Sequence, residues 1–244
     1  MRFLLLQLYG PLASWGDIAV GERRPSTTQP SRSAVLGLVA AALGVRRDDS
    51  EGLDALNKDL SVAFRVDGAG LLLSDFHTAQ VPQTSRKSDP RTRGDELASD
   101  DLHTVLSTRD YRCDALAFGC LWHEVESPRW SLERIADALH HPVFATYLGR
   151  KACVPALPFR PVIVEADSPV AALRLARPDA EFLEGLPLDA TRSFHWGGAV
   201  GSATQTIIRR DWLSSRGRWQ FVEREEHILV EERDRVSEQD PATT

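Results

Sequence analysis

The segment Arg2-Phe3-Leu4-Leu5-Leu6-Gln7-Leu8-Tyr9 is short and rich in aliphatic side chains, so it predicts a buried strand near the start of the chain. Residues 33–43, Ser-Ala-Val-Leu-Gly-Leu-Val-Ala-Ala-Ala-Leu, are apolar almost all round, which is typical of a helix buried between other elements. Ser31 or Ser33 can cap the start of this helix, and Gly44 suits the left-handed residue that follows a helix end.

The elements that follow indicate an α+β fold. Further strands are predicted at 60–66, 70–76, 113–123 and 161–165, and further helices around 132–139 and 169–176. Asp67-Gly68-Ala69-Gly70 carries a turn signal, so the strands on either side of it are expected to form a hairpin. The order strand, helix, strands, insertion, strand, helix, strand fits the split βαβ arrangement of a ferredoxin-like (RRM/RAMP-like) palm.

The expected domain organisation follows from these elements. A palm spans 1–76 and 113–180, an inserted thumb arm spans 77–112, a small C-terminal β-rich portion spans 181–230, and an acidic, disordered tail spans 231–244. The thumb mixes six bases with six acids and has few large apolar residues. It is therefore expected to be disordered, or to become ordered on a partner.

Composition excludes several classes of protein. The 244 residues are 42% hydrophobic and 26% charged, which suits a chain with a sizeable core. No apolar run approaches the roughly 18 residues that cross a bilayer. Three cysteines without a C-x-x-C spacing exclude a dense disulfide framework and a thiolate zinc site, and neither a P-loop nor a metal-binding histidine spacing is present. The sequence thus predicts a cytoplasmic protein with no cofactor, no membrane contact and no small-molecule substrate.

The net charge of −6 is unevenly distributed along the chain. Residues 219–244 hold eight acids and three bases, so the body that precedes them is nearly neutral. Within that body, 20–47 and 147–161 are basic islands. Because a local patch rather than the total charge binds polyanions, the overall acidity does not exclude nucleic acid as a partner.

Two short segments could bind the phosphates and bases of RNA. Pro30-Ser31-Arg32-Ser33 joins free backbone N–H groups, a helix dipole and a guanidinium, although ordinary helix capping explains the same residues. Tyr147-Leu148-Gly149-Arg150-Lys151 joins an aromatic ring, a glycine and two cations, and its alternative is a loop with exposed charges. A metal-free ribonuclease also remains open, because the chain supplies residue types for acid–base catalysis. These are His77, Tyr111, Tyr147 and Lys151.

Several stretches, taken together, resemble a known family. In chain order they are 4–16 (Leu-Leu-Leu-Gln-Leu-Tyr-Gly-Pro-Leu-Ala-Ser-Trp-Gly), Arg24-Pro25-Ser26-Thr27, 30–38, Asp75-Phe76-His77-Thr78, Asp110-Tyr111-Arg112, 147–153 and Arg209-Arg210-Asp211-Trp212. The chain resembles the Cas5 family of the RAMP superfamily, as found in the type I-E CRISPR surveillance complex, Cascade. The similarity covers nearly the whole chain.

The resemblance implies a non-catalytic RNA-binding subunit that holds the 5′ handle of the mature CRISPR RNA and caps one end of the complex. It implies the backbone subunit CasC and the large subunit CasA as neighbours. Arg32 and Ser33 would anchor the handle, Tyr147 would stack on a base, Gly149 would let the backbone approach, and Arg150 and Lys151 would neutralise phosphates. The thumb would add His77, Arg86, Lys87, Arg109 and Arg112 as RNA contacts. The alternative, a metal-independent endoribonuclease that processes repeat RNA, corresponds to type I-C relatives with a Tyr/Lys/His set.

Overall fold

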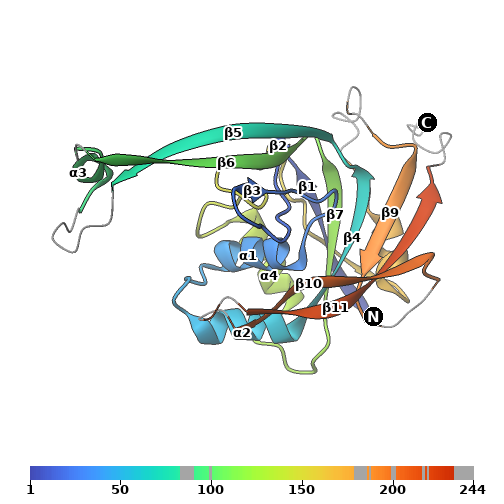
Figure 1. Ribbon diagram of the computed structural model, residues 1–244. Coiled ribbons are helices and arrows are strands. Elements are labelled where there is room, and N and C mark those ends of the chain that lie inside the picture. The colour runs from blue at the N-terminus through green and yellow to red at the C-terminus, as the bar shows by residue number, and fades with distance from the viewer. Residues whose placement is uncertain are drawn as a thin grey trace, which may run out of the picture.

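The main body of the protein is a seven-stranded antiparallel sheet. The structure is a computed structural model that describes residues 1–82, 91–98, 101–178, 186, 188–198, 202–215, 218 and 220–233. The strands lie in the order β10-β11-β9-β4-β7-β1-β8 (Figure 1). Their bounds are β1 Arg2–Tyr9, β4 Leu60–Gly68, β7 Leu116–His123, β8 Val162–Glu165, β9 Thr191–Trp196, β10 Gln205–Ser215 and β11 Gln220–Glu232.

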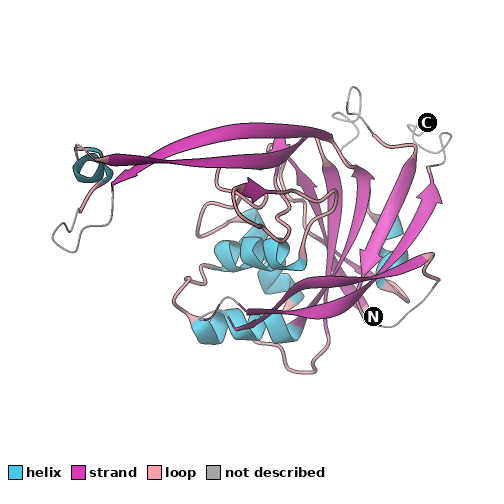
Figure 2. Ribbon diagram, in the orientation of Figure 1, coloured by secondary structure: helices cyan, strands magenta, loops and turns pink. Residues whose placement is uncertain are grey.

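Helices cover both faces of this sheet (Figure 2). They are α1 Arg32–Leu43, α2 Ser50–Asp59 and α4 Leu132–His140 on one face, and α5 Pro169–Leu175 on the other. Strand β1 lies between β7 and β8 and contributes alternate side chains to the two cores. Leu4, Leu6 and Leu8 pack against α1 and α4, while Phe3 and Leu5 pack toward α5. The predicted buried N-terminal strand is confirmed.

The predicted first helix is also confirmed. The Ser31 hydroxyl accepts the Ala34 N–H at 3.3 Å and caps α1, and Gly44 follows the last turn with a φ of 78°. Its buried positions fall on more than one side, which agrees with an apolar pattern that runs almost all round. The helices predicted around 132–139 and 169–176 and the strand predicted at 161–165 are present as α4, α5 and β8.

The predicted hairpin of 60–66 and 70–76 is wrong. Strand β4 pairs with β7 and β9, whereas β5, Leu71–Pro82, pairs with β6, Leu102–Cys113, in a second sheet. Strand β4 ends at Gly68, within the segment where the sequence signal placed a turn, but the chain leaves the main sheet there. The second sheet also contains the short strands β2, Leu12–Ala13, and β3, Arg23–Arg24.

Strands β5 and β6 form a long two-stranded ribbon that projects from the body (Figure 1). A short helix, α3, Arg93–Leu97, lies at its far end. Disorder, the first of the two expectations for the thumb, is therefore wrong for 77–82 and 102–112, while ordering on a partner stays a prediction. Beyond the root, side chains on both ribbon faces are largely exposed, so the strands lack the one-sided apolar alternation that marks a half-buried strand. Residues 83–90 lie outside the described part of the chain.

The C-terminal strands do not form a separate β-rich portion but extend the main sheet. Strand β9 pairs with β4 through Ala63 and Trp196, and β11 pairs with β9. The predicted tail boundary at 231 is also too early, because Glu231 and Glu232 belong to β11. Residues 234–244 lie outside the described part of the chain.

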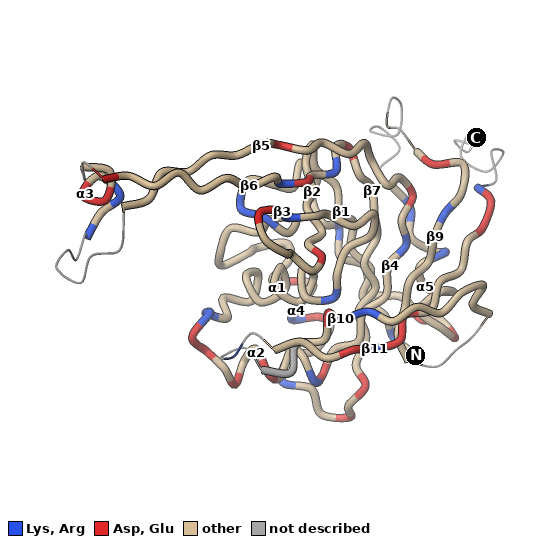
Figure 3. Tube along the Cα trace, viewed as in Figure 1, with Lys and Arg blue, Asp and Glu red and all other residues tan. Residues whose placement is uncertain are grey.

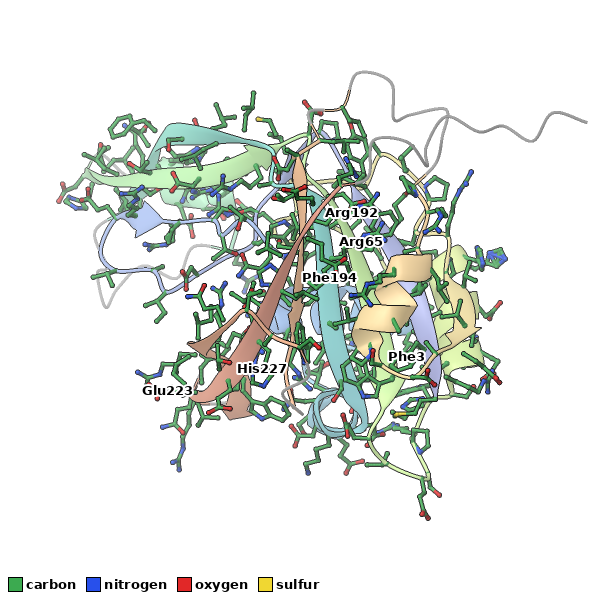
Figure 4. All side chains as sticks on the ribbon, turned by 90° about the vertical axis from the view of Figure 1, so that its right-hand side faces the viewer. Phe3, Arg65, Arg192, Phe194, Glu223 and His227 are labelled. Carbon is green, nitrogen blue, oxygen red and sulfur yellow. The ribbon has the colours of Figure 1, made fainter. Side chains whose placement is uncertain are left out.

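A buried carboxylate joins the C-terminal end of β11 to the body. Asp67, fully buried on β4, accepts Arg65 Nε at 2.7 Å and Arg65 Nη2 at 2.9 Å. Arg233 Nη2 lies 3.1 Å and Arg192 Nε 3.6 Å from the same carboxylate. Arg65 also donates to the Ala176 carbonyl just past α5, and Figure 4 shows Arg65 close to Arg192 on the α5 side of the sheet. One aspartate thus connects β4, β9, α5 and the end of β11.

Candidate nucleic-acid groove

The N-terminus of α1 opens onto a groove that we call the α1 groove, made of two adjoining cavities of about 620 and 440 Å³. Both cavities are lined by Gly16, Asp17, Ala19, Ser31, Ser33 and Phe221. The larger one extends along β10 and β11 to Arg209 and Arg210. The smaller one extends along α1 to Tyr147, Gly149, Arg150 and Arg24. The two segments singled out from the sequence, 30–33 and 147–151, therefore border one continuous hollow.

At the helix end, Ser31 and Ser33 line both cavities of the groove. Ser33 is exposed, and its Oγ lies 3.3 Å from the Ser31 Oγ. The first N–H groups of a helix lack carbonyl partners within the helix, and the dipole is positive there. This end of α1 can therefore attract a phosphate, as the sequence suggested, but through Ser31, Ser33 and the backbone.

Arg32 does not take the predicted place beside that phosphate site. Its side chain is buried, and Nη2 donates to the carbonyls of Asn57 and Leu60 at 2.7 and 2.9 Å, while Nη1 donates to the Asn57 side chain. The guanidinium also stacks on the Trp212 ring, 4.1 Å from its centroid. Burial and the nearby Arg224 charge lower the pKa of Arg32 to about 10. Arg32 therefore joins α1 to the end of α2 and to β10.

The 147–151 loop is held against the start of the chain. The Ser14 N–H donates to the Leu148 carbonyl at 3.0 Å, and the Leu148 N–H donates to Cys153 at 2.7 Å. Gly149 has a φ of +90°, and a Cβ there would lie 1.8 Å from the Ser14 carbonyl oxygen. This glycine allows the protein's own backbone to approach, a role that differs from the predicted approach of RNA. Tyr147 and Lys151 are exposed.

Arg150 lies between the loop and the ribbon. Its Nη1 donates to the Asp110 carbonyl at 3.2 Å and its Nη2 to the Arg24 carbonyl at 3.0 Å. The guanidinium also stacks on Tyr111, 4.7 Å from the ring centroid. Two of its nitrogens therefore already donate within the protein.

Basic residues gather where the ribbon joins the body (Figure 3). Arg24 lies opposite Arg109 where the backbones of β3 and β6 pair in parallel. Arg112 donates to the carbonyls of Ser26 and Thr27. Arg23 and Arg24 were not predicted as site residues, although both fall in the basic island at 20–47. His77 lies farther out, with Nδ1 3.3 Å from an oxygen of Asp75. Arg86 and Lys87 lie outside the described residues.

A buried charge cluster lies at the β10–β11 end of the groove. Glu226 accepts Arg209 Nε at 3.0 Å and Arg224 Nη2 at 2.8 Å, and His195 Nδ1 lies 3.5 Å away. Gln29 Nε2 reaches the same carboxylate at 3.4 Å and links it to the loop before α1. Burial by itself would raise the pKa of Glu226, but His195, Arg209 and Arg224 outweigh it and lower the pKa to about 2.

This cluster predicts an acid-sensitive contribution to stability. The folded pKa of about 2 lies below the unfolded value of about 4.3, so Glu226 stabilises the fold above that value and loses the effect as pH falls toward 2. We expect Glu226→Gln to be less stable at neutral pH and to show a flatter dependence of the free energy of unfolding between about pH 5 and pH 2. Urea unfolding across this range measures it. Glu225→Gln, at the exposed neighbour on β11, is the control; equal curves for Glu226→Gln and the parent would contradict the expectation.

Two of the residues considered for ribonuclease chemistry, His77 and Tyr111, are not placed to act on one phosphate. His77 pairs across the ribbon with Ser107, four residues along β6 from Tyr111, a separation of about 13 Å at strand rise. Tyr111 is covered by Arg150 and is only 9% exposed. Among the described residues no three His, Cys, Asp or Glu side chains are placed to hold a metal ion. Within the same residues no helix has the length and apolar character to cross a bilayer.

Comparison with known proteins shows which family this chain resembles. The model of the CRISPR-associated protein family Cas5 matches residues 3–225. The chain is 30% identical over 171 residues to the CRISPR system Cascade subunit CasD of Escherichia coli (strain K12), which covers 70% of this chain and 75% of the relative.

Two solved structures extend the likeness over almost the full length. A chain of a CRISPR RNA-guided surveillance complex aligns with a TM-score of 0.66 and 27% identity, covering 94% of this chain and 90% of that one. A crystal structure of a Cas protein aligns with a TM-score of 0.56 and 26% identity, covering 93% and 94%. The chain therefore belongs to the Cas5 family of CRISPR-associated proteins.

Proposed function

We propose that this protein is a non-catalytic subunit of a type I-E Cascade surveillance complex, where it holds the 5′ handle of the mature CRISPR RNA and caps one end of the backbone. Membership of the Cas5 family and similarity to a Cascade subunit support the assembly. CasC and CasA are the proposed protein neighbours, and the cytoplasm is the proposed compartment.

The observation that carries this proposal is the convergence of the α1 N-terminus and the 147–151 loop on one groove. RNA handles are single strands whose bases can stack on aromatic side chains while basic groups neutralise the backbone. Tyr147 and Phe221 supply rings along the groove, and Ser33 and the α1 N–H groups supply donors. Lys151 and Arg24 supply exposed cations beside them. An open groove with rings and donors fits a polynucleotide better than an enclosed small molecule.

The ribbon is proposed to continue the RNA path beyond the groove. Arg109 and Arg112 lie at its root next to Arg23 and Arg24, so a phosphate chain leaving the groove meets further cations. His77 lies along the same ribbon, and Arg86 and Lys87 complete the proposed thumb contacts. Here the thumb is the segment 77–112 of the predicted domain scheme.

The palm is proposed to be ferredoxin-like. Its four central strands lie in the order β4-β7-β1-β8, with α1 between β1 and β4 along the chain and α4 between β7 and β8. This is the order of a split βαβ unit, which supports the assignment. Strands β9 to β11 extend that palm beyond β4.

Phosphate contact by Lys151 predicts a change in salt dependence. We expect Lys151→Ala to bind a handle RNA more weakly. The slope of log affinity against log salt should become less steep by about 0.7, because the loss of one phosphate contact means that fewer counterions are released on binding. Filter binding or fluorescence anisotropy at several salt concentrations measures both quantities. Lys58→Ala, on exposed α2, is the control.

The same RNA separates the proposed function from the endoribonuclease alternative. Incubation of repeat RNA with the protein in EDTA should leave the RNA intact. A single specific cut would establish the enzyme, and a handle affinity equal to that of an unrelated RNA for both Lys151→Ala and the parent would refute the handle-binding role.

A further inference from the structure

The root of the ribbon is fastened to the body by β2 and β3, which pair with β6, and by the side chains of three consecutive β6 residues. Asp110, only 3% exposed, accepts the Ser74 hydroxyl at 2.6 Å and lies 3.4 Å from Arg23 Nη2. Its carbonyl accepts the Ser14 hydroxyl at 3.1 Å. Tyr111 and Arg112 follow, with the contacts to Arg150 and to the 26–27 backbone given above. The direction in which β5 and β6 leave the body is decided at this root.

Small rotations at the root become large displacements at the tip. Twelve strand residues span about 40 Å, so a turn of roughly 10° moves the far end by about 7 Å. A two-stranded ribbon is weakly stable by itself and cannot correct its own direction. Fixing that direction therefore requires stiff contacts at the root, and Arg150 supplies one whose side chain also lines the α1 groove.

We propose that Arg150 is a positioning residue that fixes the angle between the ribbon and the α1 groove, and that it is not a ligand of RNA phosphate. A single guanidinium contacts the Asp110 carbonyl on β6, the Arg24 carbonyl on β3 and the Tyr111 ring, while its own backbone belongs to the groove loop. The planar fork serves two acceptors and a ring at once, which a lysine ammonium cannot do.

The biological consequence of this role rests on the proposed function, whereas its test uses the free protein without RNA. If RNA lies in the groove and another subunit contacts the ribbon, the groove and the ribbon must be held at a fixed distance from each other. Arg150 joins the two surfaces directly, so one side chain can hold that geometry before any partner binds.

The test measures the ribbon direction without RNA. Spin labels on Leu97→Cys at the ribbon tip and Asp54→Cys on α2, with Cys113→Ser to remove a partly exposed thiol, report a distance distribution by pulsed EPR. We expect one narrow distribution in the parent and in Lys151→Ala, and a broadened or displaced one in Arg150→Ala. Arg150→Lys, which keeps the charge, should resemble Arg150→Ala.

Each outcome decides the proposal. An unchanged distribution in the Arg150 variants, or a broad one already in the parent, overturns it. Should Arg150→Ala fail to fold by thermal melting, Arg150→Lys and Tyr111→Leu carry the same comparison. In handle binding, Arg150→Ala should lower affinity while leaving the salt slope at the parent value, unlike Lys151→Ala, whereas a slope reduced by about 0.7 would show that Arg150 contacts phosphate. Failure of all RNA binding with a distribution that depends on Arg150 would refute the proposed function and leave the positioning role intact.

Discussion

Replacing Asp67 with alanine is expected to lower the free energy of unfolding by about 3–5 kcal/mol, because removal of one partner leaves buried charges without compensation. Asp67 and Arg65 are almost fully excluded from water, and Arg233 is nearly so. The change also frees the end of β11 from β4. Urea unfolding followed by circular dichroism measures the loss.

Two variants separate charge from packing at this site. Asp67→Asn keeps the volume and removes the charge, so it should show most of the loss seen with alanine. Asp48→Ala removes an exposed carboxylate that pairs with exposed Arg46, and surface pairs of this kind contribute little to stability because solvent screens them. A loss for Asp67→Ala no larger than that for Asp48→Ala would contradict the buried hub.

Gly149→Ala is expected to disturb both stability and the groove. The left-handed φ costs a residue with a side chain about 1–3 kcal/mol, and the added Cβ cannot coexist with the Ser14 carbonyl in its present place. The loop must move away from residue 14, which shifts Tyr147 and Lys151 and weakens handle binding. Thermal melting and RNA titration report the two effects separately.

Gly37→Ala is the matched control for this prediction. Gly37 lies within α1, and a Cβ there would meet no atom within 4 Å. Alanine in a helix interior is favoured over glycine by up to about 1 kcal/mol, so this variant should be as stable as the parent or more so. If both glycine variants unfolded alike, the tight contact with Ser14 would have no energetic weight.

The sequence was most informative where burial imposes a pattern. The aliphatic run of β1 and the all-round apolar character of α1 follow from elements enclosed in a core, and Ser31 and Gly44 marked the ends of the helix. Helix α4 was found for a similar reason, since its apolar positions repeat at helical spacing. Helix α2 was missed because it is mostly polar and buries only Gly52 and Leu56.

Pairing between distant segments was harder to predict. The chain does break between strands at Ala69 and Gly70, yet β4 finds its neighbours in β7 and β9, and local turn chemistry carries no information about them. The predicted strand 70–76 is the first half of β5, but the rest of the ribbon was missed since neither face contacts a core along most of its length. The segment 181–230 was predicted to be rich in β-strands. That these strands belong to the main sheet depends on long-range pairing with β4, which the sequence pattern does not show.

The site shows the same division between local and distant information. Residue types singled out 30–33 and 147–151, and the structure places both segments at one groove. Composition could not say where each side chain points, so Arg32 was assigned to RNA although Asn57, Leu60 and Trp212 surround it. Likewise, the acceptors of Arg150 lie 40 and 126 residues away along the chain, so composition could not show that this side chain already donates within the protein.

The position of β1 has a consequence for how the molecule loses its structure. Neighbouring side chains of β1 enter opposite hydrophobic layers. Deletion of one residue from the middle of this strand would therefore turn every side chain beyond the deletion from one layer to the other. Neither layer can melt while the other persists, because each needs the same strand in the same register. The sheet and its helices should therefore denature in a single cooperative step, whereas the projecting ribbon can fray without starting that collapse.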